Sequence, residues 1–183
     1  MEVTNKTKYH ISYNTQTLKV KKVRDNAILP TRGSEEAAGI DLYACIENVE
    51  SLIVYDERHM ITDGKRNHPD SDEIAIPQGY TVLIPTGIAC DFPEGYFGMM
   101  FPRSSVGTKR GLVLANTSGI LDNDYKGEIL MAFKNTGHGD KLIYHGDRLA
   151  QMILLPYVTY NIVETDTLTK SERGEGGFGS TGL

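Results

Sequence analysis

Short apolar runs separated by turn-forming residues recur along most of the chain. Residues 17–23 (TLKVKKV) alternate polar and apolar side chains, as a half-buried strand does. No stretch keeps a helical period of 3.6 residues over ten positions, so we expect at most one short helix. Runs of five to eight residues broken by Gly, Pro, Asn and Asp are typical of an all-β sandwich or barrel. Further runs of this kind lie within 38–44, 73–92, 93–102, 111–121, 127–135, 141–158 and 159–166.

The chain shows no internal repeat and no linker that would divide it. Its 183 residues fit one compact domain over 1–183. Residues 54–73 (VYDERHMITDGKRNHPDSDE) break the pattern, being rich in charge and turn formers between two strands. We expect a solvent-exposed inserted loop or hairpin there, with a functional lid or a contact for a protein partner as the alternative. The glycine-rich end, 171–183, is expected to form a flexible C-terminal arm.

Composition excludes several classes of function. The net charge of −5 gives no basic field for nonspecific binding of a nucleic acid polymer. No apolar run approaches the roughly 20 residues of a membrane span, and the N-terminus lacks the apolar core of a signal peptide. The two cysteines, Cys45 and Cys90, lie inside apolar runs and predict buried free thiols, against a disulfide or metal pair. A reducing, cytoplasmic location is expected.

Two stretches carry more chemistry than a β core needs. Asp41 stands between apolar neighbours in AGIDLYA, so its side chain must reach water or be paired. A purely structural salt bridge to an arginine is the ordinary alternative to a functional role. The stretch PRSSVGTKRG supplies a guanidinium, two hydroxyls and bare backbone N–H groups, a combination that suits a polyphosphate. A surface turn with an incidental arginine would look similar. The residues concerned are Arg103, Ser104, Ser105 and Gly107.

The stretch LANTSGILDNDYKGEI, residues 114–129, is the most informative. Asp122 directly follows an apolar pair, with Asn116 six residues before it and Tyr125 three residues after it. A hairpin that begins with a polar amide can present hydrogen-bonding groups to the edge of a base, and an acid beside it can take a proton from water. Asn123 and Asp124 would also make a plain hairpin turn, but such a turn leaves Asp122 unexplained.

Two later stretches carry isolated charges. In HGDRLAQMIL, Arg148 could neutralise Asp41 or a phosphate, or form an ion pair at the strand edge. The terminal RGEGGFGSTGL has five glycines among eleven residues, with single aromatic and basic residues, Phe178 and Arg173. Because glycine loses the most entropy on ordering, this end is either an inert tail or an arm that orders over an anionic, aromatic ligand.

Taken together and in order, AGIDLYA, PRSSVG, NTSGILDNDYKGE, GDRLAQ and RGEGGFGSTG resemble the five motifs of the homotrimeric dUTP pyrophosphatases. The resemblance covers about residues 17 to 183 apart from the segment 54–73. It implies a jelly-roll protomer of the β-clip type and a homotrimer with three active sites, each shared between subunits. It also implies Mg²⁺-dependent hydrolysis of dUTP to dUMP and diphosphate, which keeps uracil out of DNA and supplies the precursor of thymidylate.

The same resemblance implies roles at the base, the sugar and the reacting water. Asp122 matches the general base that orients and deprotonates the water attacking the α-phosphorus. Tyr125 would lie under the deoxyribose and leave no space for a 2′-hydroxyl. Uracil would be read by Asn116 with the backbone of Gly119, Ile120 and Leu121.

The phosphates and the metal are assigned in the same way. Asp41 would act through metal-bound water or by anchoring Arg148. Mg²⁺ would ride on the three substrate phosphates, with no direct protein ligand. In the arm, Phe178 would stack on uracil, which contributes roughly 1–3 kcal/mol, and Arg173 would reach the γ-phosphate. The remaining phosphate contacts would come from Arg103, Ser104, Ser105, Gly107, Arg148, Gln151, Gly179 and Ser180.

Some positions depart from the common family pattern. Ser105 replaces a frequent glycine, and Lys126 a frequent arginine, but no catalytic group is lost. A dCTP deaminase shares the fold and an Arg-Ser-Ser stretch, yet it should lack the Asp–Tyr pair and the glycine-rich arm. A regulatory trimer that binds a protein partner through 54–73 is a further alternative, as an added role beside catalysis.

Overall fold

The computed structural model describes residues 16–49, 51–64 and 72–177. Within these ranges the chain forms fourteen β-strands and one α-helix, α1 (Ser104–Arg110). The strands form two five-stranded sheets and two smaller two-stranded sheets, and every neighbouring pair is antiparallel. The prediction of an all-β protomer with at most one short helix is therefore confirmed for the described residues.

The first sheet, called sheet I, alternates buried and outward side chains. In its second strand Met131 and Phe133 are fully buried, whereas Ala132 and Lys134 point outward, as the period of two requires. Sheet I consists, in spatial order, of β10 (Leu112–Leu114), β12 (Leu130–Asn135), β7 (Thr81–Pro85), β4 (Leu52–Tyr55) and β5 (Ile61–Gly64).

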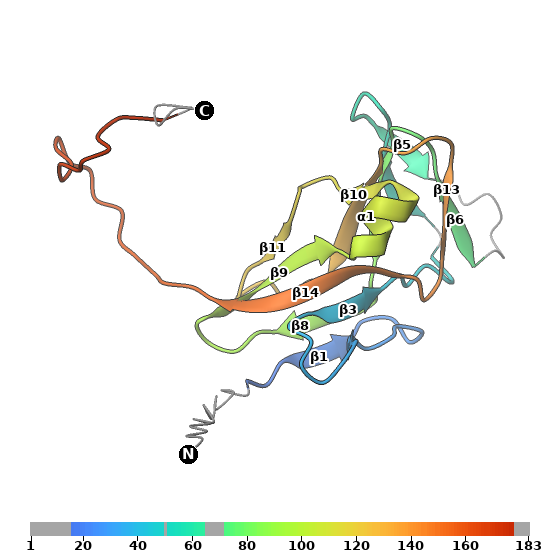
Figure 1. Ribbon diagram of the computed structural model, residues 1–183. Helices are drawn as coiled ribbons and strands as arrows, with labels where there is room; N and C mark the ends of the chain where they lie inside the picture. Colours follow the sequence, from blue (N-terminus) through green and yellow to red (C-terminus); the bar gives the residue numbers. More distant parts are fainter. Residues whose placement is uncertain (1–15, 50, 65–71, 178–183) are drawn as a thin grey trace, which may run out of the picture.

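The second sheet, called sheet II, is arranged around its longest strand (Figure 1). It consists, in spatial order, of β11 (Gly119–Leu121), β9 (Tyr96–Pro102), β14 (Arg148–Pro156), β3 (Ile40–Tyr43) and β2 (Thr31–Arg32). The two-stranded sheets pair β1 (Lys19–Lys22) with β8 (Ile88–Asp91) and β13 (Lys141–Tyr144) with β6 (Glu73–Ile76).

One apolar core joins the sheets. Side chains from both five-stranded sheets enter it, including Leu42 and Met152 of sheet II and Ile84 and Phe133 of sheet I. Their burial supplies the main driving force for folding. Cys45 and Cys90 are buried free thiols within the same core, as predicted, and burial raises the pKa of Cys90 to about 11.

The prediction of a strand-like run over 159–166 is wrong. The last strand of sheet II ends at Pro156, and no strand is assigned over 157–177. This segment runs away from the sheets (Figure 1), leaving Tyr160, Ile162 and Val163 about four-fifths or more exposed. A strand needs a neighbour for its backbone N–H and C=O groups, and the segment has no such neighbour in the described chain.

The segment 54–73 begins as a hairpin. Its first residues complete β4, and the chain returns as β5 through a turn in which the Asp56 carboxylate accepts hydrogen bonds from the backbone N–H groups of Arg58 and Met60, each at 2.9 Å. Residues 65–71 lie outside the described ranges. No helix in the described chain could cross a membrane, since α1 has only seven residues.

Candidate active site

Three charged side chains meet where β3, β9 and β14 lie side by side, and we call them the guanidinium cluster: Asp41, Arg103 and Arg148. Asp41 is only 8% exposed, and its carboxylate is 2.9 Å from Nε of Arg103 and 3.2 Å from Nη1 of Arg148. The sequence predicted a salt bridge between Asp41 and an arginine as one alternative, and the structure contains two such salt bridges. Two guanidinium groups face a single carboxylate and remain partly exposed, so the cluster suits an anion.

The helix α1 begins beside this cluster. Arg103 is extended, with φ −68° and ψ 146°, and its backbone N–H donates to the carbonyl of Leu149 at 3.0 Å, which ties the helix start to β14. Ser104 and Ser105 form the exposed first turn, followed by Gly107. Gln151 pairs with Asp41 across β14 and β3, and its Nε2 lies 3.5 Å from the carbonyl of Pro102. The structure thus brings together part of the predicted phosphate-binding set, namely Arg103, Ser104, Ser105, Arg148 and Gln151.

The predicted hairpin around Asn116 is a crossover between sheets instead. β10 pairs with β12 in sheet I, whereas β11 pairs with β9 in sheet II, so residues 115–118 pass from one sheet to the other. Thr117 takes a left-handed conformation with φ 64°, and Gly119 packs so closely on Met100 that an added Cβ would lie 2.8 Å from its Cε. Both flanking strands bury alternate side chains, but they do so in different sheets, so residues 115–118 must cross between the sheets. Asn116 is exposed on the connection.

Asp122 follows β11 directly and opens a turn closed by the Tyr125 N–H, which donates to the Asp122 carbonyl at 3.1 Å. The Asn123 side-chain amide fixes this turn by donating to the carbonyls of Pro93 and Tyr96, each at 2.8 Å. The predicted turn at Asn123 and Asp124 therefore exists. We call residues 116–125, which end with this turn, the Asp122 segment.

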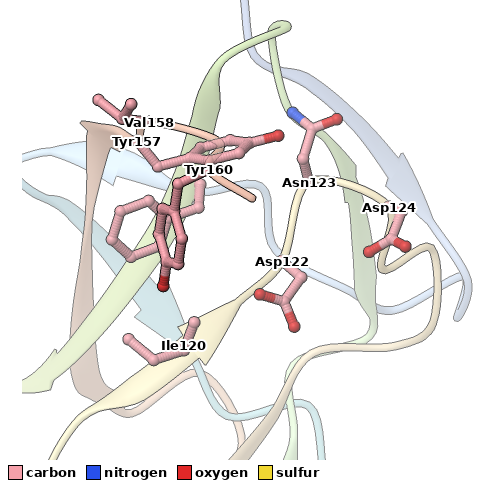
Figure 2. Close-up of a pocket in the computed structure, with 8 residues that line it drawn as sticks. Ile120, Asp122, Asn123, Asp124, Tyr157, Val158 and Tyr160 are labelled. Atoms are coloured by element: carbon pink, nitrogen blue, oxygen red, sulfur yellow. The ribbon is translucent and has the colours of Figure 1, made fainter. Parts of the chain in front are cut away.

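The Asp122 carboxylate is exposed at an open pocket of about 740 Å³. The rings of Tyr157 and Tyr160 lie across the pocket from it (Figure 2). Phe97 contacts Tyr157 edge to face, with ring centroids 6.4 Å apart. Sequence reasoning missed this aromatic wall, because these residues lie in apolar runs with no distinguishing spacing. The pocket is lined by Phe97, Ile120, Asp122, Asn123, Asp124, Tyr157, Val158 and Tyr160.

One chain does not bring Asp122 and Arg103 together. Leu121 pairs with Gly98 on β9, and the antiparallel direction carries Asp122 further from Arg103. Arg103 lies five positions after Gly98 along the extended chain, which corresponds to about 17 Å at about 3.3 Å per position. The guanidinium cluster and the Asp122 carboxylate therefore lie at opposite ends of β9.

The described part of the C-terminal arm, residues 171–177, also lies apart from both groups (Figure 1). Arg173 is exposed, and its Nε donates locally to the carbonyl of Gly176 at 2.9 Å. Phe178, Gly179 and Ser180 lie outside the described residues. Within the described chain, Asn116, Asp122 and Arg173 thus lie on separate surfaces and do not converge on one pocket.

Comparison with known proteins gives a consistent answer. The family model for dUTPase matches residues 70–182. The deoxyuridine 5′-triphosphate nucleotidohydrolase of Syntrophotalea carbinolica is 36% identical over 169 residues, covering 92% of this chain and 99% of the relative. That of Rickettsia typhi is 38% identical over 167 residues, covering 91% and 97%.

A solved structure agrees. The dUTPase of Staphylococcus bacteriophage 80alpha with dUPNHPP superposes with a TM-score of 0.69 at 26% identity, covering 92% of this chain and all of the other. The residues matched by the family model include β9, β14 and the Asp122 segment. This chain belongs to the dUTPase family.

Proposed function

We propose that this protein hydrolyses dUTP to dUMP and diphosphate. The observation that carries the proposal is the match to deoxyuridine 5′-triphosphate nucleotidohydrolases at 36–38% identity over nearly the whole chain. Such a reaction limits the dUTP available for incorporation into DNA and produces dUMP. The site residues support it, because the chain offers an anion-binding cluster and an exposed carboxylate with room for a nucleotide beside it.

The phosphates are held at the guanidinium cluster. Arg103 and Arg148 supply charge, and Asp41 fixes the orientation of both by accepting one hydrogen bond from each. The hydroxyls of Ser104 and Ser105, exposed on the first turn of α1, and the amide of Gln151 complete the set of donors. This arrangement positions the triphosphate and spreads its negative charge, which is most of what phosphoryl transfer requires.

Asp122 acts as the general base. Its carboxylate accepts a proton from water as the water oxygen bonds to the α-phosphorus, and the bond from that phosphorus to the bridging oxygen of the departing diphosphate breaks. Asn116 and the backbone of 119–121 read the uracil edge, and the ring of Tyr125 supports the deoxyribose.

The active site is shared between copies of this chain in a homotrimer. About 17 Å of strand separates the positions beside Asp122 and Arg103 within one copy, so a single substrate needs the Asp122 segment of one subunit and the guanidinium cluster of another. The exposed apolar side chains of 158–168 also favour burial against a second copy. The arm of a further subunit closes the site and excludes water.

Mg²⁺ fits this site as a companion of the triphosphate. Both oxygens of Asp41 are already engaged by arginines, and the described residues contain no group of three or more His, Cys, Asp and Glu side chains able to hold a metal ion. The substrate phosphates would hold the ion, with Asp41 reached through water. When bound, the ion neutralises charge on the phosphates.

The test is a substrate panel. Diphosphate release should be measured with dUTP, UTP, dCTP and dTTP, with and without Mg²⁺, and ammonia release should be measured with dCTP. We expect Mg²⁺-dependent diphosphate release from dUTP far above that from the other three nucleotides. Ammonia release from dCTP would instead identify a deaminase, and inactivity toward dUTP would refute the proposal.

A further inference from the structure

The ring of Tyr125 is fixed at two points within its own loop. Its hydroxyl donates a hydrogen bond of 2.7 Å to the main-chain carbonyl of Glu128. Its edge lies on Gly127, where an added Cβ would come within 2.6 Å of the hydroxyl oxygen and 2.8 Å of Cζ. The side chain is nevertheless 43% exposed, so it remains open to a ligand. The position of the ring therefore depends on the position of the Glu128 backbone.

The side chain of Glu128 is in turn held by a bidentate ion pair. Its Oε1 is 2.7 Å from Nε of Arg24, and its Oε2 is 2.9 Å from Nη2 of the same guanidinium. Oε1 also accepts a hydrogen bond from the backbone N–H of Gly87 at 2.9 Å. The pair is partly buried, and two parallel bonds fix its geometry as well as its distance. The Glu128 hydrogen bond is the main cause that raises the pKa of Arg24.

Gly87 is a rigid point of attachment. It has φ +71°, and an added Cβ would lie 2.6 Å from Cβ of Ala27 and 2.7 Å from Sγ of Cys45. Its carbonyl accepts hydrogen bonds from the N–H groups of Val23 at 2.8 Å and Arg24 at 3.3 Å. The backbone and side chain of Arg24 thus connect to the same core position that holds Glu128.

We propose that Arg24 and Glu128 are positioning residues for the discrimination between deoxyribose and ribose. They hold the carbonyl that tethers Tyr125, so the ring cannot retreat from a 2′-hydroxyl. Neither residue needs to touch the nucleotide. The inference rests on the proposed placement of the deoxyribose on Tyr125. Lys126, although closer in sequence, has no such connection, because its ammonium binds Asp91 and the carbonyl of Asn123.

The experiment compares kcat/KM for UTP and dUTP in five proteins: the wild type, Tyr125→Phe, Arg24→Ala, Glu128→Gln and the double variant Arg24→Ala/Tyr125→Phe. Loss of one hydrogen bond in Tyr125→Phe should raise the UTP/dUTP ratio roughly three- to tenfold. Arg24→Ala and Glu128→Gln should raise it in the same direction. The double variant should resemble Tyr125→Phe, because both changes remove the same tether.

Arg110→Ala is the matched control. Arg110 forms an ion pair of 3.0 Å with Asp147 at exposures close to those of Arg24 and Glu128, but it has no connection to Tyr125. Its loss should leave the UTP/dUTP ratio unchanged, even if turnover of both nucleotides falls. If Arg24→Ala fails to fold, Arg24→Lys and Glu128→Gln carry the same comparison.

Three results would overturn the inference. Wild-type ratios in folded Arg24 and Glu128 variants would show that the ion pair does not position the ring. A double variant whose ratio is the product of the two single effects would show that Arg24 acts by another route. Absence of dUTP hydrolysis in the wild type would refute the proposed function itself. The kcat/KM of the wild type for dUTP distinguishes this outcome from the other two.

Discussion

In the guanidinium cluster, all three charged side chains find partners within one chain, whereas the Asp122 carboxylate accepts no hydrogen bond from the described residues. The cluster lies where three neighbouring strands of one sheet meet. The Asp122 segment lies at a sheet edge, on connections that cross between two sheets. Both regions are needed for the proposed reaction. Within the described part of one chain, however, the guanidinium cluster is fully assembled, whereas the Asp122 carboxylate has no group of that cluster beside it.

This contrast separates binding from catalysis. A preformed cluster of cations can hold phosphates without waiting for other subunits, because the ion pairs with Asp41 already fix both arginines. In the proposed trimer, Asp122 acts only after assembly brings it beside a substrate held at the cluster of another subunit. Substitution of Asp122 itself should therefore affect turnover most, and changes in the cluster should affect nucleotide affinity and turnover together.

The largest expected effect comes from Asp122→Asn. The amide keeps the size of the side chain but cannot take a proton, so turnover should fall roughly 100- to 10,000-fold while binding of a non-hydrolysable dUTP analogue persists. Single-turnover rates and calorimetric titration measure the two separately. Turnover within threefold of the wild type would remove Asp122 from the role of base.

A mixing experiment tests whether the two regions act across subunits. Deletion of residues 173–183 should abolish activity with little change in thermal stability, because the described part of this segment, 173–177, makes no core contact.

Trimers reassembled from arm-deleted chains and Asp122→Asn chains should regain measurable activity, since some sites then combine an intact base with an intact arm. Inactive mixed trimers, once their formation is demonstrated by mass, would mean that each arm serves its own subunit.

A smaller effect is expected from Asp41→Asn. Weakening two charge-assisted hydrogen bonds should lower kcat/KM for dUTP roughly 10- to 100-fold. The matched control is Asp91→Asn, since Asp91 also pairs with two cations, Lys19 and Lys126, but is 53% exposed. Exposed pairs contribute little, so the control should stay near wild-type activity. Equal losses in both variants would show that the cluster has no special part in phosphate binding.

The sequence predicted the two regions unequally. Strand content followed from local rules, and so did the expectation that Asp41, an acid between apolar strand residues, must either reach water or be paired. The structure shows that it is paired. The position of residues 115–118 between two sheets did not follow, since a turn signal states that the chain reverses but not which strands it joins. The Arg24–Glu128 pair is separated by 104 residues and carries no motif, so only the fold could reveal it. The strand predicted at 159–166 failed because apolar periodicity does not identify a partner.

The smallest expected effect concerns Cys90, which lies in the core near Lys126, the neighbour of Tyr125. Its pKa is raised from 9.0 to about 11, chiefly by burial, so the folded state keeps the proton longer than the unfolded state does. Stability due to this thiol is complete below about pH 9 and is lost as the pH rises toward 11, by about 2 kcal/mol. Melting temperatures of the wild type should fall more steeply over this interval than those of Cys90→Ala. Parallel profiles would indicate that solvent reaches the Cys90 thiol in the folded state.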